Sequence, residues 1–474
     1  MSTQRSTNIW KIAGLLGLTG LIGLAAPPRP GPGAPGPQPR PERAPAPSPQ
    51  VDIESELMIT DLRVVEDRAR TNPRDRRAPW TFRHLIENMA GDSDPAEFAM
   101  NWLVQWETDQ SINGQVNAAR PAIRDLVIDP WLAKSGGDRL DLSQAPFKLL
   151  AIVNRIDLRS HDGDSVDTGG EGRFVFGVLD TDGNPLPPLA GTAPGGFVLI
   201  FEYELVADSM GDLRSWANDW HALGRERLGS REYNARLERI TRRFTDRDRA
   251  PLKPNGNAIN QIRTNELALG FPWELREFVI SPDSGMLVEQ TVANTPGTLE
   301  INGTELLRDL INDNETEILD GSFALPPVWF GASSLSGPFV VDAFPNADQR
   351  TFTVRPFFEQ FVNLPWSAAG IRSNDARHVF AVNTCNGCHN DETGTAFLQI
   401  GFPQGHNLPA SLGSPAELAG FLTGTEVPDP VEPATTRSFN DLDRRRTDLQ
   451  DLLTSFGTDG RGPGPRSHRP GFVH

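Results

Sequence analysis

The chain has only two cysteines, and both stand beside a histidine in the run Cys385-Asn386-Gly387-Cys388-His389. Residues three and four positions apart face the same way in a helical turn, so both thiols and the imidazole should project from one side. Two such thiols can form thioether bonds with the vinyl groups of a porphyrin while the imidazole reaches the iron, and this spacing is typical of covalent haem attachment. We therefore expect one haem c, bound through Cys385 and Cys388 and ligated by His389.

Two other chemistries remain open for these residues. Two thiols this close can form a structural or redox-active disulfide in an oxidising compartment, without any haem. Zinc also binds cysteine and histidine, but it needs a fourth ligand, which the sequence does not offer at the usual spacing. Haem attachment is favoured because the histidine directly follows the second cysteine and no further cysteine is present.

The segment around the motif resembles the c-type cytochromes. Residues 375–384 (DARHVFAVNT), which lead into the motif, are also similar to uncharacterised exported proteins with a single haem. The resemblance covers only the C-terminal part of the chain. It implies a small, mostly α-helical cytochrome c-like domain in which Cys385 and Cys388 carry the thioethers and His389 is the proximal iron ligand.

The second axial ligand is not determined by the sequence. Small c-type cytochromes commonly use a methionine downstream of the motif, but here no methionine follows Met286. His406 is the best placed candidate within the expected haem domain, whereas Met286, or an earlier methionine, would have to reach across from the preceding domain. His378 would share the motif's face only in one continuous helix, and His468 and His474 lie in the tail. A second protein ligand would suit electron transfer, whereas an open iron would bind peroxide, oxygen or nitric oxide.

The N-terminus is predicted to be an export signal. Arg5 and Lys11 form a basic region before the apolar run 12–24, and the small residues that end at Ala25 suit a signal peptidase. The run is short for a bilayer span, so we expect a signal peptide over residues 1–25 and a periplasmic or extracellular protein. The mature protein would then have no membrane span, unless Pro27 prevents cleavage. Proline-rich residues 26–50 should form a disordered linker.

The composition is that of a soluble globular protein, with 38% hydrophobic and 23% charged residues. The net charge of −17 argues against nucleic acid as a partner, because phosphate backbones are bound by clustered lysine and arginine. A redox partner protein is the expected partner.

Two folded regions should position the motif. Residues 51–365 combine helical patterns over 82–106 and from Leu213 onward with strand-like runs over 147–158, 173–179, 197–205 and 273–280. Strands grouped in this way predict an α+β domain with a largely antiparallel sheet and no assigned role.

The second region, residues 366–457, should be the haem domain, followed by a disordered tail over 458–474. We expect one of its helices to open with the capping residues at Ser414 and to stop at Gly424. Another should run from Ser438 to Gly457.

For other polar patterns in the sequence, a structural explanation is favoured over a functional site. Charged residues on strands 152–159, 201–204 and 261–266 could line a pocket, but a solvated sheet face with cross-strand ion pairs is favoured. The acidic loop 161–171 lacks the spacing of known calcium loops. The arginine-rich helix over 231–244 is favoured as an amphipathic surface helix, with docking of an acidic redox partner as the alternative. No catalytic constellation stands out beyond the haem motif, so enzymatic activity is left open.

Overall fold

Ser48–His474 form one compact unit. The computed structural model describes residues 49–162, 165–186, 196–270, 273–292, 296, 301–329, 331, 365–389, 392–395, 397–403 and 413–458. The predicted signal peptide, nearly all of the predicted linker and almost all of the tail lie outside these residues, as do His406, His468 and His474. Within the described ranges, no helix combines the length and the apolar character needed to cross a bilayer.

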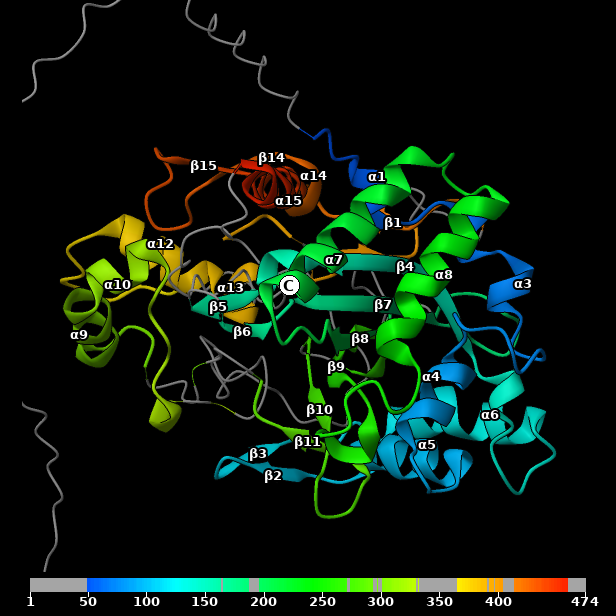
Figure 1. The fold of residues 1–474 in the computed structure, drawn as a ribbon. Coiled ribbons are helices and arrows are strands. Elements are labelled where there is room, and N and C mark those ends of the chain that lie inside the picture. Colours follow the sequence, from blue (N-terminus) through cyan, green and yellow to red (C-terminus); the bar gives the residue numbers. More distant parts are fainter. Residues whose placement is uncertain are drawn as a thin grey trace, which may run out of the picture. The chain divides into compact units, whose positions relative to one another are not determined.

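A seven-stranded sheet, in the order β1-β4-β7-β8-β9-β10-β11, forms the centre of the fold (Figure 1). Every pair of neighbouring strands is antiparallel. The strands are β1 (Met58–Ile59), β4 (Phe147–Arg155), β7 (Glu171–Val178), β8 (Val198–Glu204), β9 (Ile259–Asn265), β10 (Glu277–Ile280) and β11 (Leu287–Gln290). This arrangement, with the helices around it, confirms the expected α+β class with an antiparallel sheet.

An aromatic core covers one face of this sheet. Its helices are α4 (Phe82–Met89), α5 (Pro95–Leu103), α7 (Met210–His221) and α8 (Arg231–Thr245), and Figure 1 shows α7 and α8 in front of the strands. Trp102, Trp216 and Phe244 pack with the strand residues Phe174 and Phe201. The arginine-rich helix buries its predicted apolar stripe here, at positions 233, 237, 240 and 244.

The helix predicted over 82–106 is interrupted. The side chain of Asp94 accepts hydrogen bonds from the backbone N–H groups of Ala96 and Glu97, and Pro95 is the first residue of α5. An aspartate at the N-cap followed by proline is a strong start signal, so a new helix begins there.

Shorter elements surround this centre. The helices are α1 (Ile53–Glu56), α2 (Leu62–Val65), α3 (Arg68–Thr71), α6 (Asp129–Lys134), α9 (Glu305–Asp313) and α10 (Glu315–Asp320). Two separate strand pairs are β2 (Gln110–Ile112) with β3 (Gln115–Asn117), and β5 (Ser160–Asp162) with β6 (Ser165–Thr168).

The C-terminal part covers the other face of the sheet. Its helices are α12 (Asn374–Val382), α13 (Cys385–Cys388), α14 (Gly420–Thr423) and α15 (Asp441–Thr458). Its strands are β12 (Ile400–Gly401), β13 (Glu417–Leu418), β14 (Thr425–Pro428) and β15 (Thr436–Phe439). Phe402, Phe421 and Leu422 share a buried cluster with Val153 and Val175 of the sheet. The region predicted to carry the haem therefore shares a core with the region before it.

One helix predicted in this region is wrong. Residues after Ser414 do not continue into a long helix, because Glu417 and Leu418 pair with Gly401 and Ile400 in β12–β13. Only the turn of α14 remains helical. The later helix is present as α15, but it starts at Asp441 because the residues before it form β15.

Candidate haem-attachment site

The motif begins α13, and Thr384 caps this short helix. The Thr384 hydroxyl accepts a hydrogen bond from the backbone N–H of Gly387 (3.1 Å) and donates one to the Ala381 carbonyl (2.7 Å). The indole Nε1–H of Trp366 also donates to it, at 3.0 Å. A Cβ on Gly387 would lie 2.0 Å from the Ala381 carbonyl oxygen, so the turn from α12 into α13 requires glycine there.

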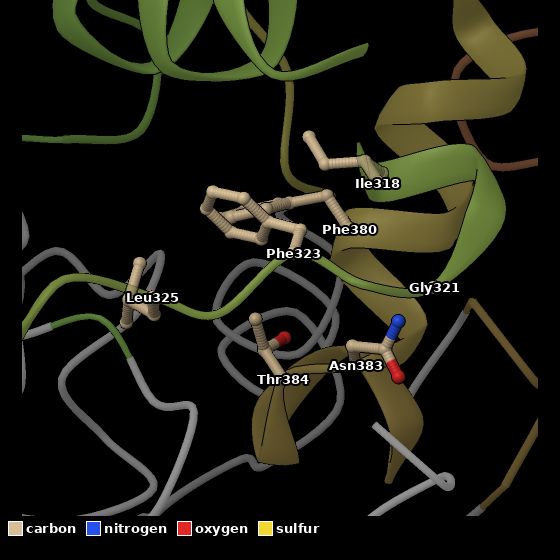
Figure 2. A pocket seen from close by; sticks show the side chains of 7 residues that line it. All are labelled: Ile318, Gly321, Phe323, Leu325, Phe380, Asn383 and Thr384. Atoms are coloured by element: carbon tan, nitrogen blue, oxygen red, sulfur yellow. The ribbon is translucent and has the colours of Figure 1, made fainter. Parts of the chain in front are cut away.

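A small pocket lies beside this turn (Figure 2). Its residues come from α10, the segment after it and α12, and they include Ile318, Phe323, Leu325, Phe380 and Thr384. The rings of Phe323 and Phe380 lie 6.3 Å apart across it. The pocket is mostly apolar and belongs to the packing that holds the motif's first turn.

Both cysteines of the motif are reduced thiols and are fully buried. Cys385 packs in an apolar cluster with Trp273 and Phe397, whereas Cys388 packs in the cluster on the sheet face. Gln399 Nε2 donates to Cys388 Sγ at 3.2 Å, and burial raises the pKa of this thiol well above its usual value.

The two thiols and the imidazole do not converge as zinc ligands would. Among the described residues, the one group of three metal-ligating atoms within 4.8 Å of one another does not include Cys385, Cys388 or His389. The two thiols lie in different buried clusters, although the sequence predicts that they project from one side of a helical turn.

His389 is held as a neutral imidazole. Its Nδ1 bonds the Phe397 carbonyl oxygen, which can only accept, so Nδ1 carries the proton and Nε2 the lone pair. Burial lowers the pKa of His389 to about 4, although the bond to Phe397 acts in the opposite direction. A backbone carbonyl on the other ring nitrogen is the usual way in which proteins orient a metal-binding histidine.

Trp273 and Asn265 fix this arrangement from the sheet side. The Trp273 ring stacks on the imidazole with ring centroids 5.2 Å apart and an angle of 28°. Trp273 Nε1 donates to Asn265 Oδ1 (2.8 Å), and Asn265 Nδ2 donates to the same Phe397 carbonyl (2.7 Å). His389 is therefore positioned by residues that stand more than a hundred positions earlier in the chain.

A small cavity of about 40 Å³ lies between the motif and the sheet. His389 lines it together with apolar side chains, which include Met58, Val153, Val175, Val198, Ile200 and Leu422. Its polar lining includes Arg155, Arg173, Asn265, Gln399 and Arg445. A mostly apolar lining with a few polar groups is of the kind found at small-molecule sites, although this cavity is small.

The candidates for a second axial ligand fall in different places. Met286 packs against the aromatic core on the opposite face of the sheet, away from this cavity. His378 Nδ1 bonds Glu392 at 2.7 Å. Met58, which the sequence did not single out, lines the same cavity as His389. His406 remains a prediction outside the described residues.

The charged strands form cross-strand ion pairs, as expected, but the sheet face is not solvated. Arg173 pairs with Glu202 (3.1 Å), and Arg263 pairs with Glu202 (3.5 Å) and Glu277 (2.8 Å). All four side chains are buried. The expectation of a solvated face was wrong because the C-terminal part lies over it, which no local pattern reveals.

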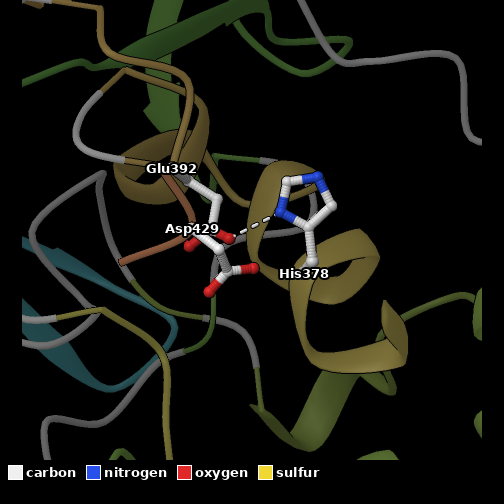
Figure 3. Close-up of side chains that lie close together, drawn as sticks. All are labelled: His378, Glu392 and Asp429. Carbon is white, nitrogen blue, oxygen red and sulfur yellow. Dashed lines mark hydrogen bonds and ion pairs between the residues drawn. The ribbon is translucent and has the colours of Figure 1, made fainter. Parts of the chain in front are cut away.

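His378, Glu392 and Asp429 lie close enough to suggest a metal site (Figure 3). Arg377, however, already donates to both carboxylates, at 2.7 to 3.0 Å from Glu392 and 3.0 Å from Asp429. Arg437 Nε adds a further bond to Asp429 at 2.9 Å. Two guanidinium groups would repel a cation, so we interpret this group as a buried ionic clamp that holds α12 to the segments after the motif.

The sequence identified the residues of the motif but not those that surround it. Asn265, Arg155, Arg445 and Met58 come from distant parts of the chain, and only the fold brings them to one cavity. Trp273 contacts His389 and Asn265 beside it. No known family model matches the chain, and neither the curated proteins nor the solved structures contain a match to it.

Proposed function

We propose that this chain is an exported electron-transfer protein with one haem c, bound through Cys385 and Cys388 and ligated by His389. The observation that carries the proposal is the state of His389. Directly after the second cysteine stands a neutral, buried imidazole whose Nδ1 is held by a backbone carbonyl and which lines a mostly apolar cavity. The residues present therefore suit a haem, and the C-terminal region would be its cytochrome c-like part.

The haem would supply one-electron oxidation and reduction. The chain itself would orient the iron ligand through the Phe397 carbonyl and the Trp273 ring, and keep water from it with the apolar lining of the cavity. Axial ligands, hydrogen bonds and burial are the means by which a protein sets a haem potential. A redox partner protein in the periplasm or outside the cell would exchange the electron.

Expression of the full chain in a host with haem-maturation machinery tests this proposal. We expect the intact mass to exceed that of the polypeptide by one haem, which resists acid-acetone extraction, and a sharp α-band on reduction. The Cys385→Ala/Cys388→Ala variant should lose the added mass. Colourless wild-type protein with a reducible disulfide would instead support a thiol-disulfide function.

A second candidate function is binding of a small ligand at an open iron. The cavity beside His389 favours it, because its mouth is open and its lining is largely apolar. Carbon monoxide added to the reduced protein separates the two functions. A fast spectral shift supports the open site, and no shift supports ligation by two protein groups.

A further inference from the structure

We propose that a second pocket, at the edge of the central sheet, binds a small aromatic carboxylate. The ring would lie among aromatic side chains of the pocket, and the carboxylate would meet Lys148 and Arg83. This pocket has a volume of about 220 Å³, whereas the cavity beside His389 has about 40 Å³. The inference goes beyond the proposed function and does not depend on the haem.

The pocket lies on the aromatic side of the sheet. Leu149 of β4 and Phe176 of β7 line it, and the two residues are partners in the strand register. Both belong to the aromatic core. Val153 and Val175 of the same strands line the cavity beside His389 and belong to the cluster on the other face. The sheet therefore separates the two sites.

The shortness of β1 leaves space for this pocket. β1 has two residues, which pair with residues 152 and 153 of β4. Among the described strands it is the only neighbour of β4 on that side, so residues 147–149 of β4 extend beyond it. They line the pocket together with residues from 65–73, which begin at the end of α2, and from 80–83, at the start of α4.

The inner lining is aromatic and well held. Trp80, Phe82 and Phe176 line the pocket and are at most 2% exposed. Phe147 also lines it and packs against Phe82 with ring centroids 4.1 Å apart. Trp80 Nε1 donates to Thr241 Oγ1 at 2.9 Å, which fixes the indole. Because an apolar cavity of about 150 Å³ is enough to bind benzene, this pocket has room for one aromatic ring with a small substituent.

The ionisable side chains that line the pocket are two cations and one acid. Arg83 Nη1 donates to the Pro73 carbonyl at 3.3 Å, and Arg83 Nε pairs with Glu87 at 2.8 Å. Lys148 Nζ pairs with Glu66. The side chains of Arg83 and Lys148 are 12% and 21% exposed, whereas that of Glu66 is 40% exposed. An aromatic interior with cationic groups beside it suits a planar anion that has an apolar ring.

A ligand carboxylate could take the place of Glu66 as the partner of Lys148. Ion pairs between partly exposed side chains contribute little to stability, because water solvates the carboxylate that is released. The ligand's carboxylate would meet Lys148 beside a bound ring that excludes water, where a charged hydrogen bond is stronger. A cationic ligand is disfavoured, because Lys148 already neutralises Glu66 and Arg83 would repel a positive charge.

Titrations of the full chain with benzoate and with benzyl alcohol, followed by the NMR signals of each probe, test this inference. The two probes share the ring and differ in charge. We expect benzoate to bind the wild type with a Kd of about 1 mM or below, and benzyl alcohol to bind more weakly. Lys148→Gln should weaken benzoate binding by roughly tenfold or more, because the carboxylate loses a charged partner, and should change benzyl alcohol binding by less than about twofold.

Two further variants locate the binding. Lys253→Gln is the matched control, because Lys253 pairs with Glu204 at 2.5 Å, is 27% exposed and does not line the pocket. It should leave both dissociation constants unchanged. Ala145 lines the pocket, so the larger side chain of Ala145→Phe should occupy the space of the ring and abolish binding of both probes.

Wild-type protein that binds no benzoate up to about 10 mM would overturn the inference. Equal weakening by Lys148→Gln and Lys253→Gln would do the same, as would unchanged benzoate binding by Ala145→Phe. If Ala145→Phe does not fold, the comparison of the two lysine variants still decides the outcome. A wild-type chain that binds benzoate but carries no haem would refute the proposed function and support this inference.

Discussion

The buried imidazole of His389 should make the haem-free chain sensitive to acid. Its pKa is about 4 in the folded state, below the ordinary value of 6.5, so between these values the unfolded chain binds the proton more readily. The free energy of unfolding should therefore fall as the pH drops from about 6.5 to 4, by up to roughly 3 kcal/mol from this group. Urea unfolding of haem-free wild type and His389→Gln across this range measures the difference. Equal pH slopes for the two proteins would refute the prediction.

Glu289 should give the free energy of unfolding the opposite dependence on pH. Burial raises its pKa to about 7, against the lowering effect of Arg276. The folded state binds this proton more tightly than the unfolded chain does, so the stability it contributes is present below about pH 4.5 and is lost as the pH rises through 7. We expect Glu289→Gln to raise the free energy of unfolding by roughly 1 to 3 kcal/mol at pH 8 and to change it little at pH 4. The exposed Glu97→Gln is the control, and an equal gain at both pH values would contradict this account.

At the level of single residues, the sequence predicted only features that depend on neighbouring residues in the chain. The spacing of Cys385, Cys388 and His389 lies within one turn of chain, so the sequence could indicate their chemistry. Trp273 stacks on His389 and Arg445 lines the cavity beside it, but nothing near these two residues in the sequence marks them. Their role depends on the pairing of distant strands and on where α15 packs.

The ionic clamp around Arg377 should stabilise the packing of α12. Arg377, Glu392 and Asp429 are almost fully buried, and removal of the arginine leaves two carboxylates with too little positive charge. We expect Arg377→Met to lower the free energy of unfolding by about 3 to 5 kcal/mol, as for other broken buried ion pairs. The control is Arg308→Met, because Arg308 pairs with acidic groups on the exposed side of α9. Its effect should be within about 0.5 kcal/mol.

Denaturant titration of both variants and the wild type measures these differences. A loss below about 1 kcal/mol for Arg377→Met would mean that water or another cation replaces the guanidinium, and the clamp would then be unimportant for stability.

The sequence predicted helices and strands correctly where one face of the element is buried and where capping residues stand at its ends. Strands β4, β7 and β8 and the helix α8 match their predicted positions, whereas β1 and β11 were not predicted. The helix expected after Ser414 failed since its capping residues competed with pairing between β13 and β12. Local capping contributes only about 1 kcal/mol, which such pairing and the packing beneath it can exceed.

Across the whole fold, the C-terminal region and the sheet stabilise each other. Phe421 and Leu442 pack on the sheet face, and Leu449 and Leu452 of α15 enter the aromatic core. Arg159 also forms a buried pair with Asp448 of α15. Large apolar side chains of this region are thus buried against strands that lie far earlier in the sequence.

A fragment that begins at residue 366 should therefore not fold by itself, although it contains the complete attachment motif. Without the sheet, its apolar side chains would face water, and each large one would lose roughly 1.5 to 3 kcal/mol of burial. We expect the fragment to show no cooperative thermal transition by circular dichroism and to bind a hydrophobic dye, whereas the chain from residue 49 onward melts cooperatively. If the fragment melts cooperatively and protects its amides from exchange, residues 366–457 are an independent domain, and the sheet is dispensable for their fold.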